Sequence, residues 1–232
     1  MKQQYFGDVN DYVKYGLLRC FSAAGLRVGV CWMMTPEDGR SDGNKTSYLG
    51  RPEEWAGHDG ELFAALQTLT REQDKSVAHF EQSNLLLNAL FYDALVPDAT
   101  AVRNVWFQQA LAKLGDSELI FFDPDNGIEV SSKPAGRKDS SKYVLWAELE
   151  RTWQTGKALL IFQHFPRISR DVYISSQVGL LRGRLAGAKV ETLSSANVLF
   201  LLAYRSEHDS RVQTALEFLQ QRWAQRVVRC PL

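Results

Sequence analysis

The sequence predicts an α/β fold in which helices cover both faces of a mostly parallel sheet. Apolar runs of strand length alternate along the chain with segments of helical periodicity, which is typical of right-handed βαβ units. With 232 residues, of which 45% are hydrophobic and 23% charged, the chain can bury a core of its own. No repeat, low-complexity tract or linker divides it. We therefore expect a single α/β domain over residues 1–232.

The first expected elements are a helix and a buried strand. Residues 8–24 have apolar side chains at helical spacing, with Asp8 as the N-cap and Gly25 as a stop signal. Residues 26–34, LRVGVCWMM, form an apolar run, and a polar, Gly-rich loop follows over 35–58. The elements then expected up to residue 123 are a helix over 60–72, a helix within 75–90, a strand over 88–96, a helix over 101–114 and a strand over 118–123.

The second half of the chain continues the alternation. Its expected elements are a helix over 141–155, a strand over 157–165, a helix over 169–186, strands over 189–194 and 197–204, and an amphipathic helix over 209–226. Because strands that alternate with helices are joined by crossovers, we expect most of them to be parallel.

Composition argues against several classes of protein. The N-terminal stretch MKQQYFGDVNDY is polar, and no segment has 18 consecutive uncharged apolar residues, so neither a signal peptide nor a membrane span is expected. Cys20, Cys31 and Cys230 form no close pair, which predicts reduced thiols in a cytoplasmic protein and no cysteine-based zinc site.

The net charge of zero conceals an asymmetry. Residues 1–150 contain 15 Lys and Arg against 22 Asp and Glu, whereas residues 151–232 contain 12 against 5. The basic part is rich in arginine. It can form a surface for phosphate-bearing partners, or a set of solvated helix faces that complements the acidic part.

Polar side chains follow three of the predicted strands. The strand 26–34 leads into TPEDGRSDGNKTSYL, 118–123 into DPDNGIE, and 157–165 into QHFPRISR. Open α/β sheets bind ligands at the carboxyl ends of their strands. The residues expected to face one crevice there are Asp38, Asp42, Asn44, Lys45, Asp123, Asp125, Glu129, His164 and Arg167. This convergence favours an enzyme.

Simpler interpretations remain for each stretch. Asp-Pro and Asn-Gly pairs are common in turns, so DPDNG can be a chain reversal. GRSDGNKT resembles a phosphate-binding P-loop but has Asn44 where that motif needs glycine, which leaves a Gly-rich ligand-binding loop or a solvated one. Helix capping accounts for Asp8 and Asp11 but not for Lys14 and Tyr15.

Two of these motifs resemble those of a known family. The order of elements is similar to the class I methyltransferase fold, a Rossmann-like variant, and GDVNDYVKYG and FFDPDNG resemble motifs of the adenine-N6 methyltransferases of large-subunit ribosomal RNA. The combination is also similar to a group of bacterial proteins without an assigned activity. Asp125 and Asn126 depart from the family motif, which has a second proline and a base-stacking aromatic residue there.

The resemblance implies an enzyme that transfers a methyl group from S-adenosylmethionine to a nucleic acid or nucleotide. The residues it implies for cofactor binding are Lys14, Tyr15, Asp38, Asp42, Gly43 and Lys45. The residues it implies for catalysis are Asp123, Pro124, Asp125 and Asn126, joined by His164 and Arg167 from the neighbouring strand end.

The same carboxylates support an alternative. Asp123, Asp125 and Glu129, with Asp38 or Asp42, form an oxygen-rich set suited to Mg²⁺ or Mn²⁺. With Lys45, His164 and Arg167 nearby, such a metal would serve phosphodiester or nucleotide hydrolysis. A third interpretation is a catalytically silent, methyltransferase-like module that binds a nucleotide or a partner.

Overall fold

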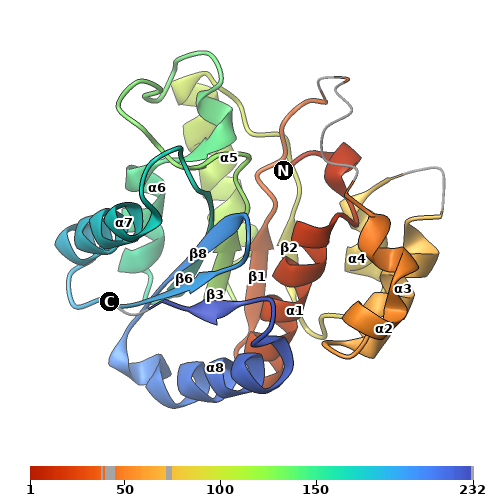
Figure 1. The fold of residues 1–232 in the computed structure, drawn as a ribbon. Coiled ribbons are helices and arrows are strands. Elements are labelled where there is room, and N and C mark those ends of the chain that lie inside the picture. The colour runs from red at the N-terminus through yellow and green to blue at the C-terminus, as the bar shows by residue number, and fades with distance from the viewer. Residues whose placement is uncertain (38, 40–44, 72–74, 231–232) are drawn as a thin grey trace.

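The protein folds around a mixed β-sheet. A computed structural model describes residues 1–37, 39, 45–71 and 75–230. Within them the main sheet has seven strands in the order β2-β1-β3-β6-β8-β7-β9, and a separate two-stranded ladder joins β4 to β5. Figure 1 shows helices on both sides of the main sheet. The α/β class expected from the sequence is confirmed.

One half of the sheet is parallel. It consists of β2 (Leu90–Tyr92), β1 (Val28–Cys31), β3 (Leu119–Phe122) and β6 (Ala158–His164). In β1 and β3, Val28 pairs with Leu119 and Cys31 with Phe122, so the two strands end side by side. This aligns the loops that follow them.

The other half of the sheet is antiparallel. It consists of β8 (Val198–Tyr204), which pairs with β6 and with β7 (Lys189–Ser194), and β9 (Val228–Arg229), which pairs with β7. Only residues 195–197 separate β7 from β8. A parallel pair needs a crossover of about a dozen residues or more, so this connection permits only a hairpin. Because β8 is antiparallel to both of its neighbours, β7 runs in the same direction as β6. The sheet described here is therefore mostly parallel in strand direction, as expected, but mixed, with β8 and β9 reversed.

The sheet separates the core into two layers, and helices cover each of them. The helices are α1 (Val9–Ala23), α2 (Pro52–Trp55), α3 (Gly60–Leu69), α4 (Val77–Gln82), α5 (Thr100–Lys113), α6 (Trp146–Gln154), α7 (Arg170–Arg184) and α8 (Asp209–Trp223). Val30 and Phe121 point to the layer that holds α1, α3 and α8, whereas Cys31 and Ile120 point to the layer that holds α5, α6 and α7. The strands are thus buried on both faces.

Several boundaries differ from the expected ones. Residues 141–155 were expected to be one helix, but a 3-10 turn (Ser140–Lys142) and β5 (Tyr143–Val144) come before α6. β5 pairs with β4 (Gly127–Ile128), and the Glu148 carboxylate accepts from the Leu145 backbone N–H at 2.9 Å, which fixes the start of α6. The expected loop over 35–58 contains a 3-10 turn (Ser47–Gly50) and α2.

Other local predictions are confirmed. Asp8 caps α1 by accepting from the backbone N–H groups of Asn10 and Asp11. Gly25 follows the helix with a φ of 86°. Cys20 and Cys31 are free and buried, and burial raises the pKa of each thiol to about 12. Among the described residues, no helix combines the length and apolarity needed to cross a bilayer.

Candidate ligand pocket at the strand ends

A pocket of about 380 Å³ opens at the carboxyl ends of β3 and β6. Its walls come from the segment before α1 and its first turns, from the loop after β3, and from Phe162 and His164 on β6. From β1 the chain continues to β2, which lies on one side of β1 in the sheet, and it then passes to β3, which lies on the other side of β1. The pocket therefore lies beside the point where strand order reverses, the usual ligand site of open α/β sheets.

The loop after β3 is held in place by a buried glutamine. Gln163 accepts from the Ile128 backbone N–H at 2.8 Å and donates to the Asn126 carbonyl oxygen at 3.1 Å. Gly127 has a φ of 116°, and a Cβ atom there would lie 2.2 Å from the Gln163 side-chain oxygen. The Asp-Pro-Asp-Asn-Gly stretch is thus a turn, as its residue types indicate, but one fixed against β6 with Asp123, Pro124, Asp125 and Asn126 lining the pocket.

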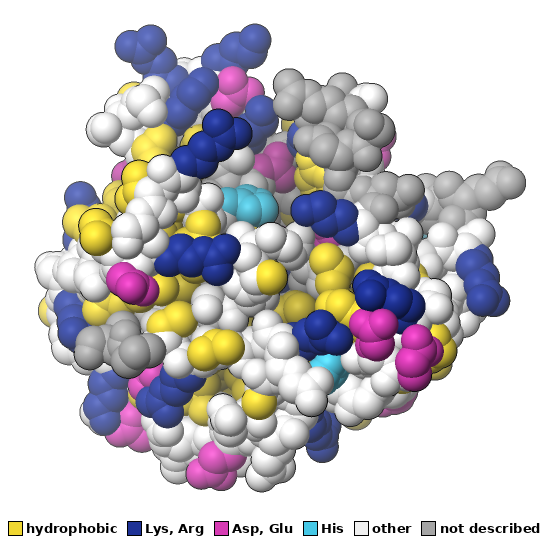
Figure 2. Space-filling view, viewed as in Figure 1, with side chains coloured by type: hydrophobic (Ala, Val, Ile, Leu, Met, Phe, Trp, Pro, Cys, Tyr) yellow, Lys and Arg dark blue, Asp and Glu magenta, His cyan; other side chains and the backbone are white. Residues whose placement is uncertain are grey.

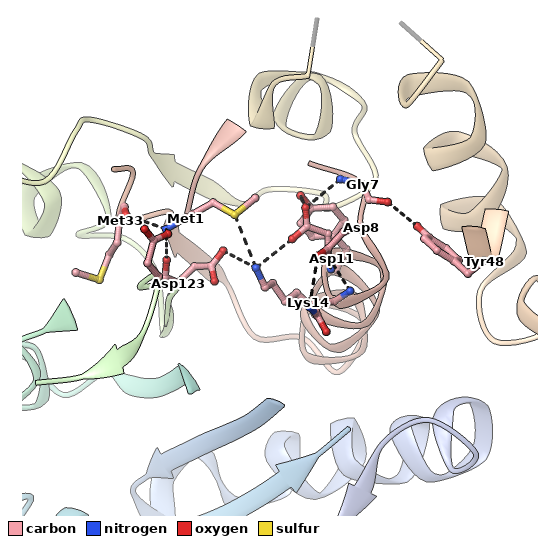
Figure 3. A network of polar contacts seen from close by, with 11 residues as sticks. Met1, Gly7, Asp8, Asp11, Lys14, Met33, Tyr48 and Asp123 are labelled. Atoms are coloured by element: carbon pink, nitrogen blue, oxygen red, sulfur yellow. Dashed lines mark hydrogen bonds and ion pairs between the residues drawn. The ribbon is translucent and has the colours of Figure 1, made fainter. Parts of the chain in front are cut away.

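A buried lysine joins two carboxylates at the floor of the pocket (Figure 3). The Lys14 ammonium lies 3.0 Å from Asp123 Oδ2 and 3.0 Å from Asp11 Oδ1, and 4.4 Å from the centre of the Phe162 ring. All three charged residues are at most 4% exposed. Burial opposes the charge of Lys14, but Asp123, Asp11 and Asp8 raise the pKa of its ammonium above the ordinary value.

Asp11 lies at the inner end of this chain of contacts. Its Oδ2 atom accepts from the Gly7 backbone N–H at 3.0 Å and from the Tyr15 hydroxyl at 3.3 Å. Burial, opposed by Lys14 and reinforced by Asp8 and Asp123, raises the pKa of Asp11 to about 7. Burial also raises the pKa of Asp8. Both carboxyl groups therefore ionise less readily than exposed aspartates do.

Asp125 has a cationic partner of its own. Its Oδ1 atom lies 2.7 Å from the α-ammonium group of Met1, and its Oδ2 atom accepts from the Thr35 hydroxyl at 2.6 Å. Burial opposes ionisation, but the α-ammonium group and these hydrogen bonds hold the pKa of Asp125 below its usual range. The same ammonium donates to the carbonyl oxygens of Met33 and Asp123, each at 3.1 Å.

The loop after β1 bends sharply to meet that ammonium. Met33 has a φ of 46°, a left-handed conformation that side chains other than glycine seldom adopt. Such backbone strain persists where surrounding contacts impose it, and it is common beside ligand sites. Here the bend directs the Met33 carbonyl oxygen to the α-ammonium group of Met1.

Two further expected residues lie at the mouth of the pocket. Lys45 is exposed, and its carbonyl oxygen accepts from the Val9 backbone N–H at 3.1 Å, which places it beside the start of α1. His164 ends β6, exposed at the pocket mouth. Partial loss of hydration and then the Lys14 charge lower the pKa of His164, against the opposing effect of Asp123. Figure 2 shows several Lys and Arg side chains on the face that it draws.

The remaining expected residues lie elsewhere. Tyr15 is fully buried and stacks on Phe80 with ring centres 3.8 Å apart, and its hydroxyl donates to Asp11. Arg167 is exposed beyond β6, and neither Arg167 nor Glu129 is among the described residues that line the pocket. Asp38, Asp42, Asn44 and Gly43 lie outside the described residues.

Two of the residues expected to bind a metal, Asp123 and Asp125, line the pocket, but each has a cationic partner. Among residues 1–37, 39, 45–71 and 75–230, no group of three His, Cys, Asp or Glu side chains could hold a metal ion. Asp123 and Asp125 face the ammonium groups of Lys14 and Met1, respectively. Glu129 follows β4 and its backbone N–H bonds to Val144. Among the described residues, Asp123, Asp125 and Glu129 thus form no group of metal ligands, and Asp38 and Asp42, the other members of the expected set, lie outside them.

Sequence reasoning missed several residues of the site. Met1 and Thr35 have no signal in the sequence, because their roles depend on three segments meeting at the ends of β1 and β3. Asp11 was explained as a favourable charge in the first turn of a helix. Gln163 directly precedes His164 in the stretch QHFPR, and its position as the last buried residue of β6 was the available signal.

Comparisons of this chain with protein-family models, curated proteins and solved structures found no match.

Proposed function

We propose that the protein is a methyltransferase that uses S-adenosylmethionine and acts on an amino group of a nucleic acid or nucleotide. The observation that carries this proposal is the pocket beside the strand-order reversal, with Asp123 and Pro124 in its wall and Lys14 bonded to Asp123. The Asp-Pro stretch and the Lys14 segment are the two motifs that resemble the adenine-N6 methyltransferases.

The strand arrangement supports the same proposal. The parallel strands β2, β1, β3 and β6 are followed by the reversed strand β8, and helices cover both faces. This order is compatible with the resemblance to the class I methyltransferase fold. The order of strands in the sheet is additional to the two short motifs and the order of elements along the chain, on which the resemblance is based.

The pocket residues fit the cofactor and an amino substrate. S-adenosylmethionine, when bound, supplies an electrophilic methyl group on a positively charged sulfur. The pocket volume suits a ligand of that size, and the carboxylates of Asp8, Asp11 and Asp123 suit its positive charge. Lys14 holds Asp123 in one orientation, so the carboxylate can accept a hydrogen bond from a substrate amino group and align its lone pair.

Two further side chains have roles in this proposal. The lowered pKa of His164 leaves its ring largely neutral at pH 7, so a ring nitrogen can accept the proton that the methylated amino group loses. Tyr5 lines the pocket and offers an aromatic face, which Asn126 cannot supply.

Basic side chains near the pocket are suited to phosphate groups. Lys45 and Lys142 line it, and the exposed Arg137 and Lys138 belong to the stretch before Lys142. Lys142 also pairs with Asp139. That stretch is anchored at its end, since Arg103 donates to the carbonyl oxygens of Ser140 and Tyr143 at 2.8 and 2.6 Å. A firmly held basic rim favours a phosphate-bearing substrate.

The test is thermal unfolding of the purified protein with S-adenosylmethionine, with its demethylated product S-adenosylhomocysteine, and with Mn²⁺. Both adenosyl ligands should raise the melting temperature, and a ligand at about 100 times its dissociation constant should stabilise the fold by about 2.7 kcal/mol. Asp123→Asn should weaken this response. Folded protein that does not bind either ligand at millimolar concentration would contradict the proposal.

The Mn²⁺ measurement separates the proposal from metal-dependent hydrolysis. We expect Mn²⁺ to leave the melting temperature unchanged. Stabilisation by Mn²⁺ that is lost in both Asp123→Asn and Glu129→Gln would instead support the metal site expected from the sequence. Under our proposal Glu129→Gln binds S-adenosylmethionine like the wild type, because Glu129 does not line the pocket.

A further inference from the structure

Met1 places its α-ammonium group inside the wall of the pocket, beside the Asp-Pro turn (Figure 3). The residue is 3% exposed, and its ammonium donates to the carbonyl oxygens of Met33 and Asp123, each at 3.1 Å. A carboxylate oxygen of Asp125 lies 2.7 Å away. Three acceptors therefore surround a group that has three N–H bonds and a full positive charge.

The ammonium joins the loops that follow β1 and β3. Met33 belongs to the first loop and Asp123 begins the second, and both bond to this group. Thr35 extends the contact, because its backbone N–H donates to the Met1 carbonyl oxygen at 2.9 Å and its hydroxyl donates to Asp125 at 2.6 Å. The position of the Asp-Pro turn thus depends on the chemical state of the Met1 amine.

A nitrogen that is joined to an acyl group or to a preceding residue cannot make all of these contacts. It is a neutral amide with one N–H, so at least one hydrogen bond and the ion pair with Asp125 are lost. The added carbonyl carbon also needs room among atoms that lie 2.7–3.1 Å from the nitrogen. Lys2, which is buried and lines the same pocket, keeps its charge, but the bonds to Met33 and Asp123 come from Met1.

We propose that Met1 is a modification site, and that the pocket is complete only when the α-amino group of this residue is free. An acyl group or a preceding residue withdraws the ammonium and releases the Asp-Pro turn. Hydrolysis of that amide, in which water splits the C–N bond to give a carboxylate and the ammonium, restores the site. The consequence for ligand binding rests on the proposed function, in which Asp123 orients the substrate amino group.

The experiment compares two forms of the full chain, each released from a cleavable fusion. One has Met1 as its first residue, and the other has a single glycine before Met1. The glycine should lower the melting temperature by about 6 °C or more, because a buried carboxylate loses its partner. Amide hydrogen exchange of residues 123–128 should become faster. In Asp125→Asn the glycine should lower the melting temperature by less than about half as much, since the buried charge is already absent.

Ligand binding is measured on the same two chains. S-adenosylmethionine should bind the glycine-extended chain at least about tenfold more weakly, since the pocket is complete in a small fraction of its molecules. Equal affinities would overturn the inference, as would equal melting temperatures with equal hydrogen exchange, or an undiminished effect of the glycine in Asp125→Asn. If neither chain binds the ligand while their melting temperatures differ as expected, the proposed function fails and the assignment of Met1 stands.

The wild-type chain provides a measurement that needs no variant. An ordinary α-amino group has a pKa of about 8, so at pH 7 it reacts with acylating reagents more readily than lysine side chains do. In the folded protein an acetyl succinimidyl ester should modify the Met1 amine at least about tenfold more slowly than in the urea-unfolded chain. Mass spectrometry of the N-terminal peptide gives both rates. Equal rates would show that the amine is not held in the pocket wall and would overturn the inference.

Discussion

Asp125 shares its carboxylate between the α-ammonium group of Met1 and the hydroxyl of Thr35. Its side chain is 8% exposed. From the sequence, Asp123 and Asp125 would be expected to repel one another, so that removing one charge stabilises the fold. The structure gives each carboxylate its own ammonium partner, and the expected effect is therefore reversed.

Asp125→Asn should lower the free energy of unfolding by about 3 kcal/mol at pH 7, because it leaves the buried ammonium without its counter-charge. The pKa of Asp125 is depressed in the folded protein, so its contribution is present above pH 5 and is lost as pH falls below 4. Urea denaturation of both proteins between pH 3 and 7 measures this. A variant as stable as the wild type at pH 7 would show that the ion pair contributes nothing.

Asp11→Asn should act in the opposite direction. The pKa of Asp11 is raised by folding, so its ionisation costs stability as pH rises from about 4 towards 8. Asparagine resembles the protonated form. The variant should therefore be more stable than the wild type at pH 8 by more than about 1 kcal/mol, with a smaller difference at pH 5. A variant destabilised equally at both pH values would show that Asp11 is ionised throughout this range.

At the scale of elements, the turn after β3 depends on β6. Gly127 has a φ of 116° and lies against the Gln163 side chain, so Gly127→Ala combines backbone strain with a steric clash. We expect it to lower the free energy of unfolding by about 3 kcal/mol, and Gln163→Ala by about 1–3 kcal/mol through the unpaired Ile128 N–H. Chemical denaturation measures both, and a neutral Gly127→Ala would contradict this account of the turn.

The contact between α1 and α8 requires a glycine at position 16. A Cβ atom on Gly16 would lie 2.0 Å from the Trp223 ring, which is fully buried. Alanine is the better helix former, so a gain of about 1 kcal/mol would be expected on an exposed helix. Here we expect Gly16→Ala to destabilise the protein by about 1–3 kcal/mol through overpacking. Thermal unfolding measures the change, and a variant that melts at a higher temperature than the wild type would contradict this expectation.

The elements that could be predicted from the sequence are those with strong local signals. The Asp8 cap, the Gly25 stop and the apolar runs of β1, β3, β6 and β8 all have local causes. The two-residue strands β4, β5 and β9 have none, since each forms only through pairing with a distant segment. The same division applies to the site. Asp123, Lys14 and His164 lie in sequence motifs that indicate a site, whereas Met1 and Thr35 reach the site through tertiary contacts that no local pattern predicts.

At the scale of the whole molecule, the charge asymmetry has two uses. Arg184 pairs with Glu150 and Arg211 with Glu118, so part of the basic C-terminal region complements the acidic region. Arg170 is positioned over the Phe165 ring and donates to the Ala196 carbonyl oxygen. Arg167, Arg182 and Lys45 are exposed and therefore accessible to a phosphate-bearing partner.

Binding of a short RNA should accordingly weaken as salt is added, because phosphate contacts release counterions. Lys45→Ala and Arg167→Ala should each reduce the slope of log affinity against log salt by about 1 without changing the melting temperature. Arg184→Ala is the matched control, since Arg184 is paired with Glu150. Fluorescence anisotropy at several salt concentrations gives the slopes, and salt-independent binding would exclude phosphate contacts at these residues.

The central claim is that the pocket beside Asp123 and Lys14 binds S-adenosylmethionine. A crystal structure of the protein grown with S-adenosylhomocysteine tests it most directly. We expect electron density for the ligand in the pocket lined by Lys14, Asp123 and His164. Ligand density at any other place on the protein, or an empty pocket at saturating ligand, would contradict the claim.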